Sequence, residues 1–563
     1  MGALLALGVS MSARAQAPSW QAGAAISGST GTTTVDATAP DANGNLYVTG
    51  SFRGTATFGT TTLTSAGNAD VYVAKWSAAT NSFAWAMRMG SAASDYTHGI
   101  AVSGSSVYVG GDFSGPTATV GGITLTNAST SGSSDVFVAK LIDAGSTSSV
   151  AWATRAGGTG SETMFRIVAN GTSVYLDGIY NGAPAVFGAT SLPTAGSSDL
   201  FVAKITDGGT TGTVSWALGA GGTGSDEVYG LAVSGASVYV CGAETSPSLV
   251  FGGTTLTGAG DYDGFIAKIT DAGATASYAW AQRVGGAGSE GFANVVVNGS
   301  NVYAAGAFTS ATLAVGSTTL ATAGNNDALL VKLTDAASTS SFNWAQRGGG
   351  PGDDIAYGLT ERNGDVYIAG FFGAFSSSGG TLAATFGAQT LTSVGGADVF
   401  VSRVRDSGAA GTFNYTQQAG GPGDDIAYAA AISANRLYVG GTFTGASVTF
   451  GSVTLTNTTF AETGFLAYLN DPILATAPAA QLPGLALYPN PARATTTVQL
   501  PASQAAAQAT LTLFDALGRP VRTATVPTGQ DYPLDLAGLA SGLYALRMRV
   551  GEEATATRQL VIE

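Results

Sequence analysis

The sequence has 563 residues, only 10% of them charged, and a formal net charge of −14 at pH 7. An acidic chain repels phosphate backbones, which argues against nucleic-acid binding, and no apolar run is long enough to predict a transmembrane helix. The chain combines 81 Gly with 24 Phe and 20 Tyr. Turn-forming Gly between aromatic and β-branched residues is typical of an all-β fold.

Residues 1–17 are similar to a signal peptide, with a short apolar core at 3–9 and small residues in the cleavage pattern at 13–17. The basic leader of such a peptide is missing. Either translation starts upstream of Met1 or the segment is not a signal, and we favour the first explanation.

Residues 18–470 contain seven repeats with a central period of 64 residues, which three landmarks reveal. The first is an aromatic residue, usually followed by Ala: Trp20, Trp85, Trp152, Trp216, Trp280, Trp344 and Tyr415. The second is a Tyr shortly before a Gly: Tyr47, Tyr108, Tyr175, Tyr239, Tyr303, Tyr367 and Tyr438. The third ends a run similar to Phe-Val-Ala-Lys: Lys75, Lys140, Lys204, Lys268, Lys332, Arg403 and Tyr468. This recurrence predicts a repeat architecture.

Each repeat contains four strand-like segments and one added hairpin. In the fourth repeat the strands are 230–234, 237–241, 264–269 and 278–282, and the hairpin is 249–257. The array begins with a fourth strand at Trp20 and ends with a third strand at 465–469. A ring uses both pieces in one sheet, whereas an open stack leaves two unpaired edges. We therefore predict an all-β, seven-bladed β-propeller over residues 18–470, closed by the N-terminal strand, with the recurring Trp as a wedge between blades.

The repeats resemble the bacterial seven-bladed β-propeller repeat family. The resemblance rests on the motifs Gly-Gly-x-Gly-Ser-Asp, x-Val-Tyr-Val-x-Gly and Asp-x-Phe-Val-Ala-Lys between Trp20 and Asn470. It implies the fold and a surface or extracellular setting, but no reaction.

The period stops after the last repeat. Residues 471–484 are rich in Ala and Pro and predict a linker. Residues 485–563 show short alternating strands, which predict a small Ig-like β-sandwich.

Three motifs in this module resemble the C-terminal sorting domain of the type IX secretion system. They are Tyr488-Pro489-Asn490-Pro491, the segment 513–522 around Gly518, and the segment 536–547 with Gly542 and Tyr544. The resemblance implies a protein of a Bacteroidetes-type bacterium. The secretion translocon would recognise residues 485–563, and the protein would then be anchored at the cell surface or released.

The sequence shows no catalytic constellation, and no cofactor is expected. His98 is the only histidine and occupies the position of Tyr229, Tyr357 and Tyr428, which favours an aromatic slot over catalysis. Cys241 is the only cysteine and occupies a small core position, which argues against a zinc site.

Carboxylates recur in two series, and their regularity favours a role in turns. The first series is Asp95, Glu162, Asp226, Glu290, Asp354 and Asp425. The second is Asp70, Asp135, Asp199, Asp263, Asp327 and Asp398, each five residues before the Lys position. Calcium is one alternative, since the Gly-rich turns are similar to calcium-binding nonapeptides, and direct contact with a ligand is another. The candidate calcium ligands are Asp226, Asp353, Asp354, Asp424 and Asp425.

The sixth repeat departs from the pattern through a longer loop that begins at residue 371. Phe371, Phe372 and Phe375 are the candidates there for exposed rings that stack on a sugar or a protein partner. We favour the other interpretation, a tolerated insertion whose rings fold inward.

These observations favour a non-enzymatic propeller, secreted or at the cell surface, that binds a polysaccharide or a surface protein or serves as a scaffold. One alternative is a carbohydrate-active enzyme that uses carboxylates in the central funnel. The other is a purely structural component of the envelope or matrix.

Overall fold

The computed structural model describes residues 18–28, 31–129, 132–375, 380–459, 461–471, 486–499, 508–515, 520–550 and 554–563. The chain divides into a first unit, residues 1–471, and a second unit, residues 472–563. The predicted signal peptide and all of the predicted linker except Asp471 lie outside the described residues. The described residues form strands, turns and loops without any helix, so they contain no helix that could cross a membrane, and the all-β prediction is confirmed.

Seven antiparallel sheets make up the described part of the first unit, each built on four strands. Sheet 1 contains β2 (Ala37–Pro40), β3 (Leu46–Phe52), β6 (Asp70–Ser77) and β7 (Ser82–Ser91). Sheet 2 contains β8 (Asp95–Ser103), β9 (Ser106–Phe113), β12 (Asp135–Asp143) and β13 (Ser148–Ala156). Sheet 3 contains β14 (Ser161–Asn170), β15 (Ser173–Asn181), β18 (Asp199–Asp207) and β19 (Gly212–Ala220). Sheet 4 contains β20 (Asp226–Ser234), β21 (Ser237–Glu244), β24 (Asp263–Asp271) and β25 (Ala276–Val284).

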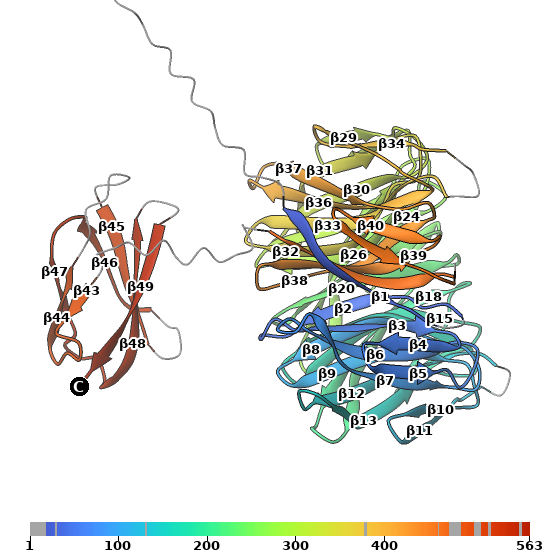
Figure 1. Cartoon of the computed structure of the whole chain (residues 1–563), viewed down its shortest axis with the longest axis horizontal. Coiled ribbons are helices and arrows are strands. Elements are labelled where there is room, and N and C mark those ends of the chain that lie inside the picture. The colour runs from blue at the N-terminus through green and yellow to red at the C-terminus, as the bar shows by residue number, and fades with distance from the viewer. Residues whose placement is uncertain are drawn as a thin grey trace, which may run out of the picture. The chain divides into compact units, whose positions relative to one another are not determined.

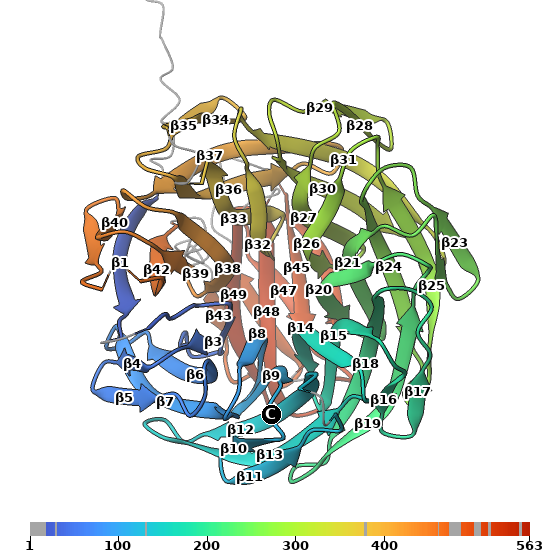
Figure 2. The same ribbon diagram turned by 90° about the vertical axis from the view of Figure 1, so that its right-hand side faces the viewer.

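The remaining three sheets follow the same order. Sheet 5 contains β26 (Glu290–Asn298), β27 (Asn301–Phe308), β30 (Asp327–Asp335) and β31 (Ser340–Gly349). Sheet 6 contains β32 (Ile355–Arg362), β33 (Asp365–Gly373), β36 (Ala397–Asp406) and β37 (Gly411–Ala419). Sheet 7 contains β38 (Asp425–Ser433), β39 (Arg436–Phe443), β42 (Thr463–Asn470) and β1 (Ser19–Ile26). Figure 2 shows the sheets side by side around a common centre, with the first strand of each repeat innermost.

The seventh sheet contains both ends of the described first unit. Strand β1 pairs antiparallel with β42, from Ser19 opposite Asn470 to Ile26 opposite Gly464. Figure 1 shows β1 beside strands from the end of the unit. The Trp20 side chain is buried there, and its Nε1 donates to the Gln418 carbonyl of sheet 6 at 3.3 Å.

A short hairpin lies between the second and third strands of every repeat, as the fourth repeat predicts. The hairpins are β4 (Thr55–Phe58) with β5 (Thr61–Thr64), β10 (Thr117–Val120) with β11 (Ile123–Thr126), β16 (Ala185–Phe187) with β17 (Thr190–Leu192), β22 (Ser248–Phe251) with β23 (Thr254–Thr257), β28 (Thr312–Val315) with β29 (Thr318–Ala321), β34 (Ala383–Phe386) with β35 (Gln389–Thr392), and β40 (Ser447–Phe450) with β41 (Val453–Thr456). Two of them pair with the preceding sheet, β10 with β7 and β34 with β31. The hairpins therefore help to join neighbouring sheets.

Five sheet-to-sheet junctions contain a clamp, which we define as an aspartate that accepts hydrogen bonds from a Lys, a Tyr and a Trp of the preceding sheet. At the end of β24, Asp271 Oδ2 lies 2.7 Å from both Lys204 Nζ and Tyr175 Oη. Trp216 Nε1 donates to Asp271 Oδ1 at 3.0 Å. Burial acts to raise the pKa of Asp271, but these hydrogen bonds outweigh it and hold the pKa below its usual value. The other clamp aspartates are Asp143, Asp207, Asp335 and Asp406.

The recurring Trp side chains are buried between sheets, as the wedge prediction requires. Their role in the clamps was not predicted. Asp70 pairs with Arg88 of its own sheet, whereas Lys75 pairs with Asp143 of the next sheet.

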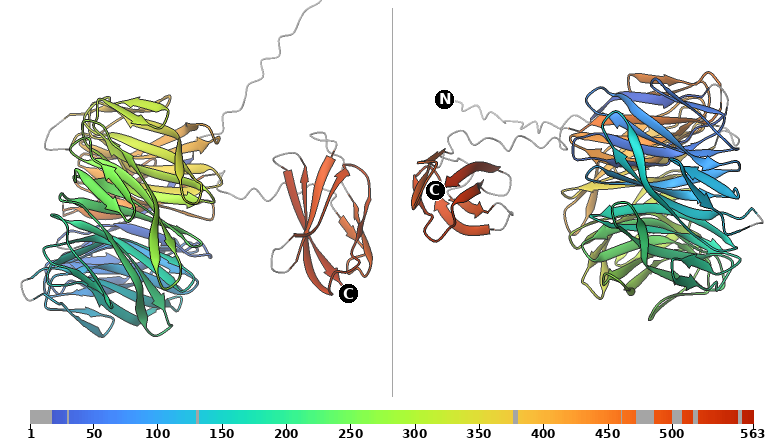
Figure 3. Two further views of the ribbon diagram at one scale, coloured as in Figure 1. Left: turned by 180° about the vertical axis from the view of Figure 1, so that it is seen from behind. Right: turned by 90° about the horizontal axis from the view of Figure 1, so that it is seen from below.

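The second unit consists of two antiparallel sheets, which Figure 3 shows from two sides, and their side chains form a common apolar core. One sheet contains β43 (Ala486–Tyr488), β44 (Thr495–Gln499) and β47 (Tyr532–Asp535). The other contains β46 (Pro520–Pro527), β45 (Gln508–Phe514), β48 (Gly542–Val550) and β49 (Ala554–Ile562). Val498 and Leu534 of the first sheet and Leu513 and Leu546 of the second contribute to the core.

Candidate functional site: a central aromatic pocket

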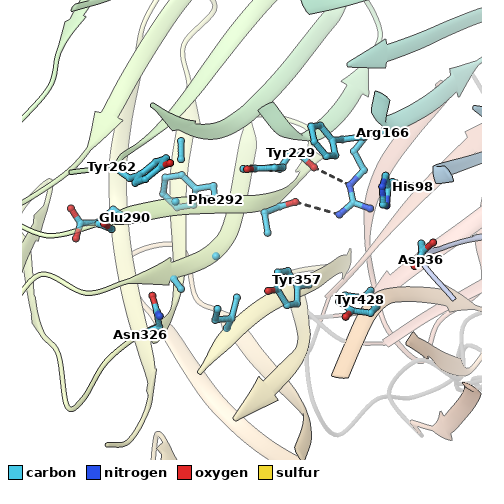
Figure 4. Close-up of a pocket in the computed structure, with 18 of the residues that line it drawn as sticks. Asp36, His98, Arg166, Tyr229, Tyr262, Glu290, Phe292, Asn326, Tyr357 and Tyr428 are labelled. Atoms are coloured by element: carbon cyan, nitrogen blue, oxygen red, sulfur yellow. Dashed lines mark hydrogen bonds between the residues drawn. The ribbon is translucent and has the colours of Figure 1, made fainter. Parts of the chain in front are cut away.

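The first unit encloses a cavity of about 640 Å³ that is lined mainly by its inner strands (Figure 4). Its size falls within the range of about 300–1,000 Å³ that is typical of ligand sites. Most of its large side chains are aromatic, and a few polar groups lie among them, which is the usual composition of a small-molecule pocket.

A repeated β-bulge explains why one residue of each of six sheets faces this cavity. In sheet 4 the register shifts between Val228 and Gly230, so Tyr229 has no partner on β21 and reaches the pocket. The same shift occurs in sheets 2, 3, 5, 6 and 7. We call the resulting set, with Asp36 just before β2, the bulge ring: Asp36, His98, Phe165, Tyr229, Ala293, Tyr357 and Tyr428. His98 thus lies in the aromatic series to which the sequence assigned it.

The aromatic members of the bulge ring touch their neighbours. Ring centroids are 5.8 Å apart for His98 and Phe165, 5.0 Å for Phe165 and Tyr229, and 5.6 Å for Tyr357 and Tyr428. Between Tyr229 and Tyr357 the series is interrupted, because sheet 5 supplies only the methyl group of Ala293. The cavity extends into this interruption.

Arg166 lines the pocket and hydrogen-bonds the backbone of two neighbouring sheets. Its Nε donates to the Tyr229 carbonyl at 2.9 Å and its Nη2 to the Ala293 carbonyl at 3.3 Å, so the side chain extends toward sheets 4 and 5 (Figure 4). Arg166 also lines a second cavity of about 150 Å³, together with His98 and Tyr428. The equivalent residues of the other sheets are Ala37, Gly99, Gly230, Asn294, Gly358 and Ala429. The sequence analysis missed Arg166, although an alignment of the repeats would have shown it as an exception.

Among the ionisable groups of the pocket, Arg166 carries a positive charge and His98 does not. Burial, followed by the nearby Arg166, lowers the pKa of His98 to about 4, so the imidazole is neutral at pH 7. Burial raises the pKa of Asp36 to about 7, and Thr34 Oγ1 donates to its carboxylate at 2.9 Å. Glu290 also lines the pocket, but its carboxylate accepts hydrogen bonds from the backbone of Gly286 and Ser310 and so secures a turn.

The predicted ligand-binding aromatics of sheet 6 do not form an exposed platform. Phe371 and Phe372 are 1% and 0% exposed, so the expectation of exposed rings is wrong for both. The reason is that β33 continues to Gly373 and is covered on both faces. Phe375 is 39% exposed, and its ring contacts Phe371 at a centroid distance of 5.2 Å.

The predicted calcium ligands lie at three separate junctions between neighbouring sheets, where Asp226 and Asp425 are the first residues of β20 and β38. Asp226 Oδ2 accepts from Gly222 N at 2.6 Å. Asp353 Oδ1 accepts from Asn326 Nδ2 at 2.8 Å, and Asp424 Oδ1 accepts from Ala397 N at 3.1 Å. In the part of the chain that the structure describes, no three Asp, Glu, His or Cys residues are grouped as a metal site. Calcium binding stays a prediction.

The two carboxylate series meet between sheets. Asp327 and Asp354 approach each other at Gly349, where an added Cβ would lie 2.1 Å from Asp327 Oδ1 and 2.7 Å from Asp354 Oδ2. Both residues are buried, and burial raises the pKa of Asp354 to about 7. Asp425 of the next junction is similar, with a pKa raised by burial to about 8.

The predicted sorting motifs lie in the second unit. The peptide bonds before Pro489 and Pro491 are cis. Asn490 Oδ1 accepts from Val561 N at 2.9 Å, which fastens this turn to β49. The Tyr488 hydroxyl donates to Asp531, and the buried Tyr544 donates to the Ala540 carbonyl at 2.9 Å. Gly542 begins β48, and Gly518 lies outside the described residues.

Comparison with known proteins identifies the second unit. Residues 486–563 match the family model described as "Secretion system C-terminal sorting domain". The protein therefore carries the sorting domain of the type IX secretion system and is exported to the cell surface or released. A search of curated protein sequences gives no match to this chain.

Three solved structures are similar at low scores. The phage phi92 endosialidase has a TM-score of 0.37 and 10% identity, covering 96% of this chain and 87% of that chain. A protein of unknown function from Dyadobacter fermentans has a TM-score of 0.34 and 10% identity, covering 80% and 97%. A sucrose-6-phosphate hydrolase from Lactobacillus gasseri has a TM-score of 0.28 and 9% identity, covering 80% and 93%. These scores are too low to carry an argument about fold or function.

Proposed function

We propose that this exported protein is a non-enzymatic binding module, whose first unit is a seven-bladed β-propeller closed by β1 and whose second unit is an Ig-like sorting domain. The pairing of β1 with β42 supports the closure, because it places both ends of the array in one sheet. The observation that carries the binding role is the central pocket, in which aromatic side chains surround a cavity of about 640 Å³.

An enzymatic role is the second candidate, because the carboxylates of Asp36 and Glu290 both line the pocket. A glycosidase needs one carboxylic acid and one carboxylate on either side of the scissile bond. Glu290 is committed to backbone hydrogen bonds, which favours binding over catalysis. Polysaccharide hydrolysis that is lost in Asp36→Asn would reverse this preference.

Thermal-shift measurements on the full chain test the binding role. The panel contains neutral and acidic oligosaccharides, choline, nucleosides and short peptides. We expect at least one class to raise the melting temperature of the wild type, and Tyr229→Ala to abolish that shift. Loss of the shift in Phe375→Ala alone would place the site on the loop of sheet 6. No shift from any compound would favour the scaffold or matrix role instead.

A further inference from the structure

We infer that the pocket binds an uncharged carbohydrate, with one sugar ring seated at Ala293 between Tyr229 and Tyr357. This inference rests on the proposed binding function and names the ligand class and its position. Ala293 then acts as the residue that determines specificity, because it leaves open the place that a larger side chain occupies in each of the other six repeats.

The wall of sheet 5 is built from small residues. Gly291 pairs with Ala307 next to the bulge, whereas the equivalent pairs of the other sheets with a bulge all contain at least one larger side chain. Those pairs are Tyr96–Asp112, Thr163–Ile179, Glu227–Ala243, Ile355–Phe371 and Ile426–Thr442. Sheet 5 therefore has small residues at Gly291, Ala293 and Ala307, and all three line the pocket.

Two glycines of this wall, Gly291 and Gly306, line the cavity without a side chain. A Cβ on Gly306 would lie 1.9 Å from the Gly291 carbonyl oxygen, so this position admits only glycine. A Cβ on Gly291 would meet nothing closer than 3.4 Å, so the space above Gly291 is open. The result is a recess whose floor is mainly backbone and methyl groups.

Aromatic rings surround the recess. Tyr229 of β20 and Tyr357 of β32 come from the two neighbouring inner strands, and Phe292 and Tyr262 line the same cavity (Figure 4). A pyranose ring in its chair form presents C–H groups on its faces and hydroxyl groups at its edge. The faces suit aromatic rings, as apolar surfaces do in other stacked contacts, and the hydroxyl groups suit polar neighbours such as Asn326 and Ser289.

The charges of the pocket favour an uncharged ligand over an anionic one. Two nitrogen atoms of Arg166 already donate to backbone carbonyls, and the His98 imidazole is neutral at pH 7. The carboxyl groups of Asp36 and Glu290 also line the pocket, and the chain has a net charge of −14, which disfavours uronates, sialates and phosphates. The volume of the cavity is also ample for more than one sugar unit, which fits the end of a chain.

Ala293→Tyr tests the position of the sugar, because it restores the aromatic residue that occupies this place in sheets 4, 6 and 7. Isothermal titration of the full chain uses the neutral oligosaccharides that shift its melting temperature. We expect Ala293→Tyr to weaken binding at least about tenfold, comparable to the loss of one good stacking contact. Val394→Tyr, at a position 63% exposed, adds the same side chain elsewhere and should leave binding unchanged.

Tyr357→Ala and Tyr357→Phe keep the test decisive if Ala293→Tyr does not fold. Stacking requires the ring, so Tyr357→Phe should retain most of the affinity and Tyr357→Ala should lose it. Wild-type affinity in a folded Ala293→Tyr, or in Tyr357→Ala, would overturn the position. Binding of choline, nucleosides or acidic sugars without any neutral sugar would overturn the ligand class but leave the binding function intact. Binding of no compound would overturn both.

Discussion

The clamps and the bulge ring are built from the same repeat, but they differ in how strictly they follow it. Five clamps use the same Lys, Tyr, Trp and Asp at the same positions. The bulge ring uses Asp, His, Phe, Ala and Tyr at one position, and Arg166 follows it where most sheets have Gly or Ala. Strict repetition thus accompanies the contacts that join sheets, and variation accompanies the cavity.

Removal of β1 should have the largest effect on the regular part of the molecule. A chain without residues 18–27 loses the pairing with β42 and the buried Trp20. We expect the free energy of unfolding to fall by more than the about 3–5 kcal/mol that one buried Trp contributes. Denaturant unfolding followed by Trp fluorescence measures this. A chain that lacks only residues 1–17 is the control, and equal stability of the two chains would refute closure by β1.

Loss of one clamp aspartate should have the next largest effect. Asp271→Ala leaves Lys204 buried without its carboxylate, and breaking a buried ion pair costs about 3–5 kcal/mol. Chemical denaturation should show this loss, while ligand affinity stays unchanged. Lys204→Met with Asp271→Asn removes both charges and should be more stable than Asp271→Ala. If Asp271→Ala is as stable as the wild type, the clamps do not hold the sheets together.

The paired carboxylates predict that mild acid stabilises the first unit. In the folded protein, burial raises the pKa of Asp95 to about 6, of Glu162 to about 7 and of Asp425 to about 8. The folded state therefore binds more protons than the unfolded chain between about pH 4 and these values. Their stabilising contribution is complete below about pH 4 and is lost as the pH rises through 6–8.

We therefore expect the free energy of unfolding to increase by a few kcal/mol from pH 8 to about pH 5. The clamp aspartates act in the opposite sense, since their lowered pKa values remove stability only below about pH 4. Urea unfolding across this range tests the sign. Asp425→Asn should flatten the slope, and stability that falls steadily from pH 8 to 5 would contradict the account.

Substitution of Glu244 should have the smallest effect on stability. This residue departs from the aromatic that the repeat places at its position, and its carboxylate does not line the pocket. It pairs in register with Asp226 and Asp263, where the other sheets place aromatics such as Phe113 and Phe308. Glu244 is 1% exposed, and within the described residues its carboxylate oxygens have no hydrogen-bond partner. Glu244→Phe should stabilise the protein by about 1–2 kcal/mol in denaturant unfolding. Phe308→Glu should destabilise it, and a loss of stability in Glu244→Phe would show that the carboxylate is structurally required.

The sequence predicted the strands that recur in every repeat. It did not predict the contacts that join one sheet to the next. Alternation and turns within 64 residues indicate the strands, so the turn between β20 and β21 lies where expected, but β20 begins at Asp226 rather than 230 and β21 ends at Glu244 rather than 241. Lys204 and Asp271 lie 67 residues apart, and their pairing requires the relative positions of two sheets. Phe371 and Phe372 seemed exposed only because the end of β33 cannot be located from the pattern of a loop.

The pocket itself left almost no trace in the sequence. A cavity formed by Gly291, Ala293 and Ala307 is marked by the absence of large side chains, and such residues are common throughout a chain with 81 Gly. Only a comparison of equivalent positions across the seven repeats distinguishes these three from the many small residues that serve turns.

A variant in which sheet 5 follows the repeat tests the central claim most directly. Gly291→Thr, Ala293→Tyr and Ala307→Ile together give sheet 5 the residues that sheets 3 and 4 have at these positions. Titration of this triple variant with a neutral oligosaccharide that the wild type binds should show no binding, while its melting temperature is equal or higher. Wild-type affinity in the folded triple variant would show that the departures of sheet 5 from the repeat do not form the site.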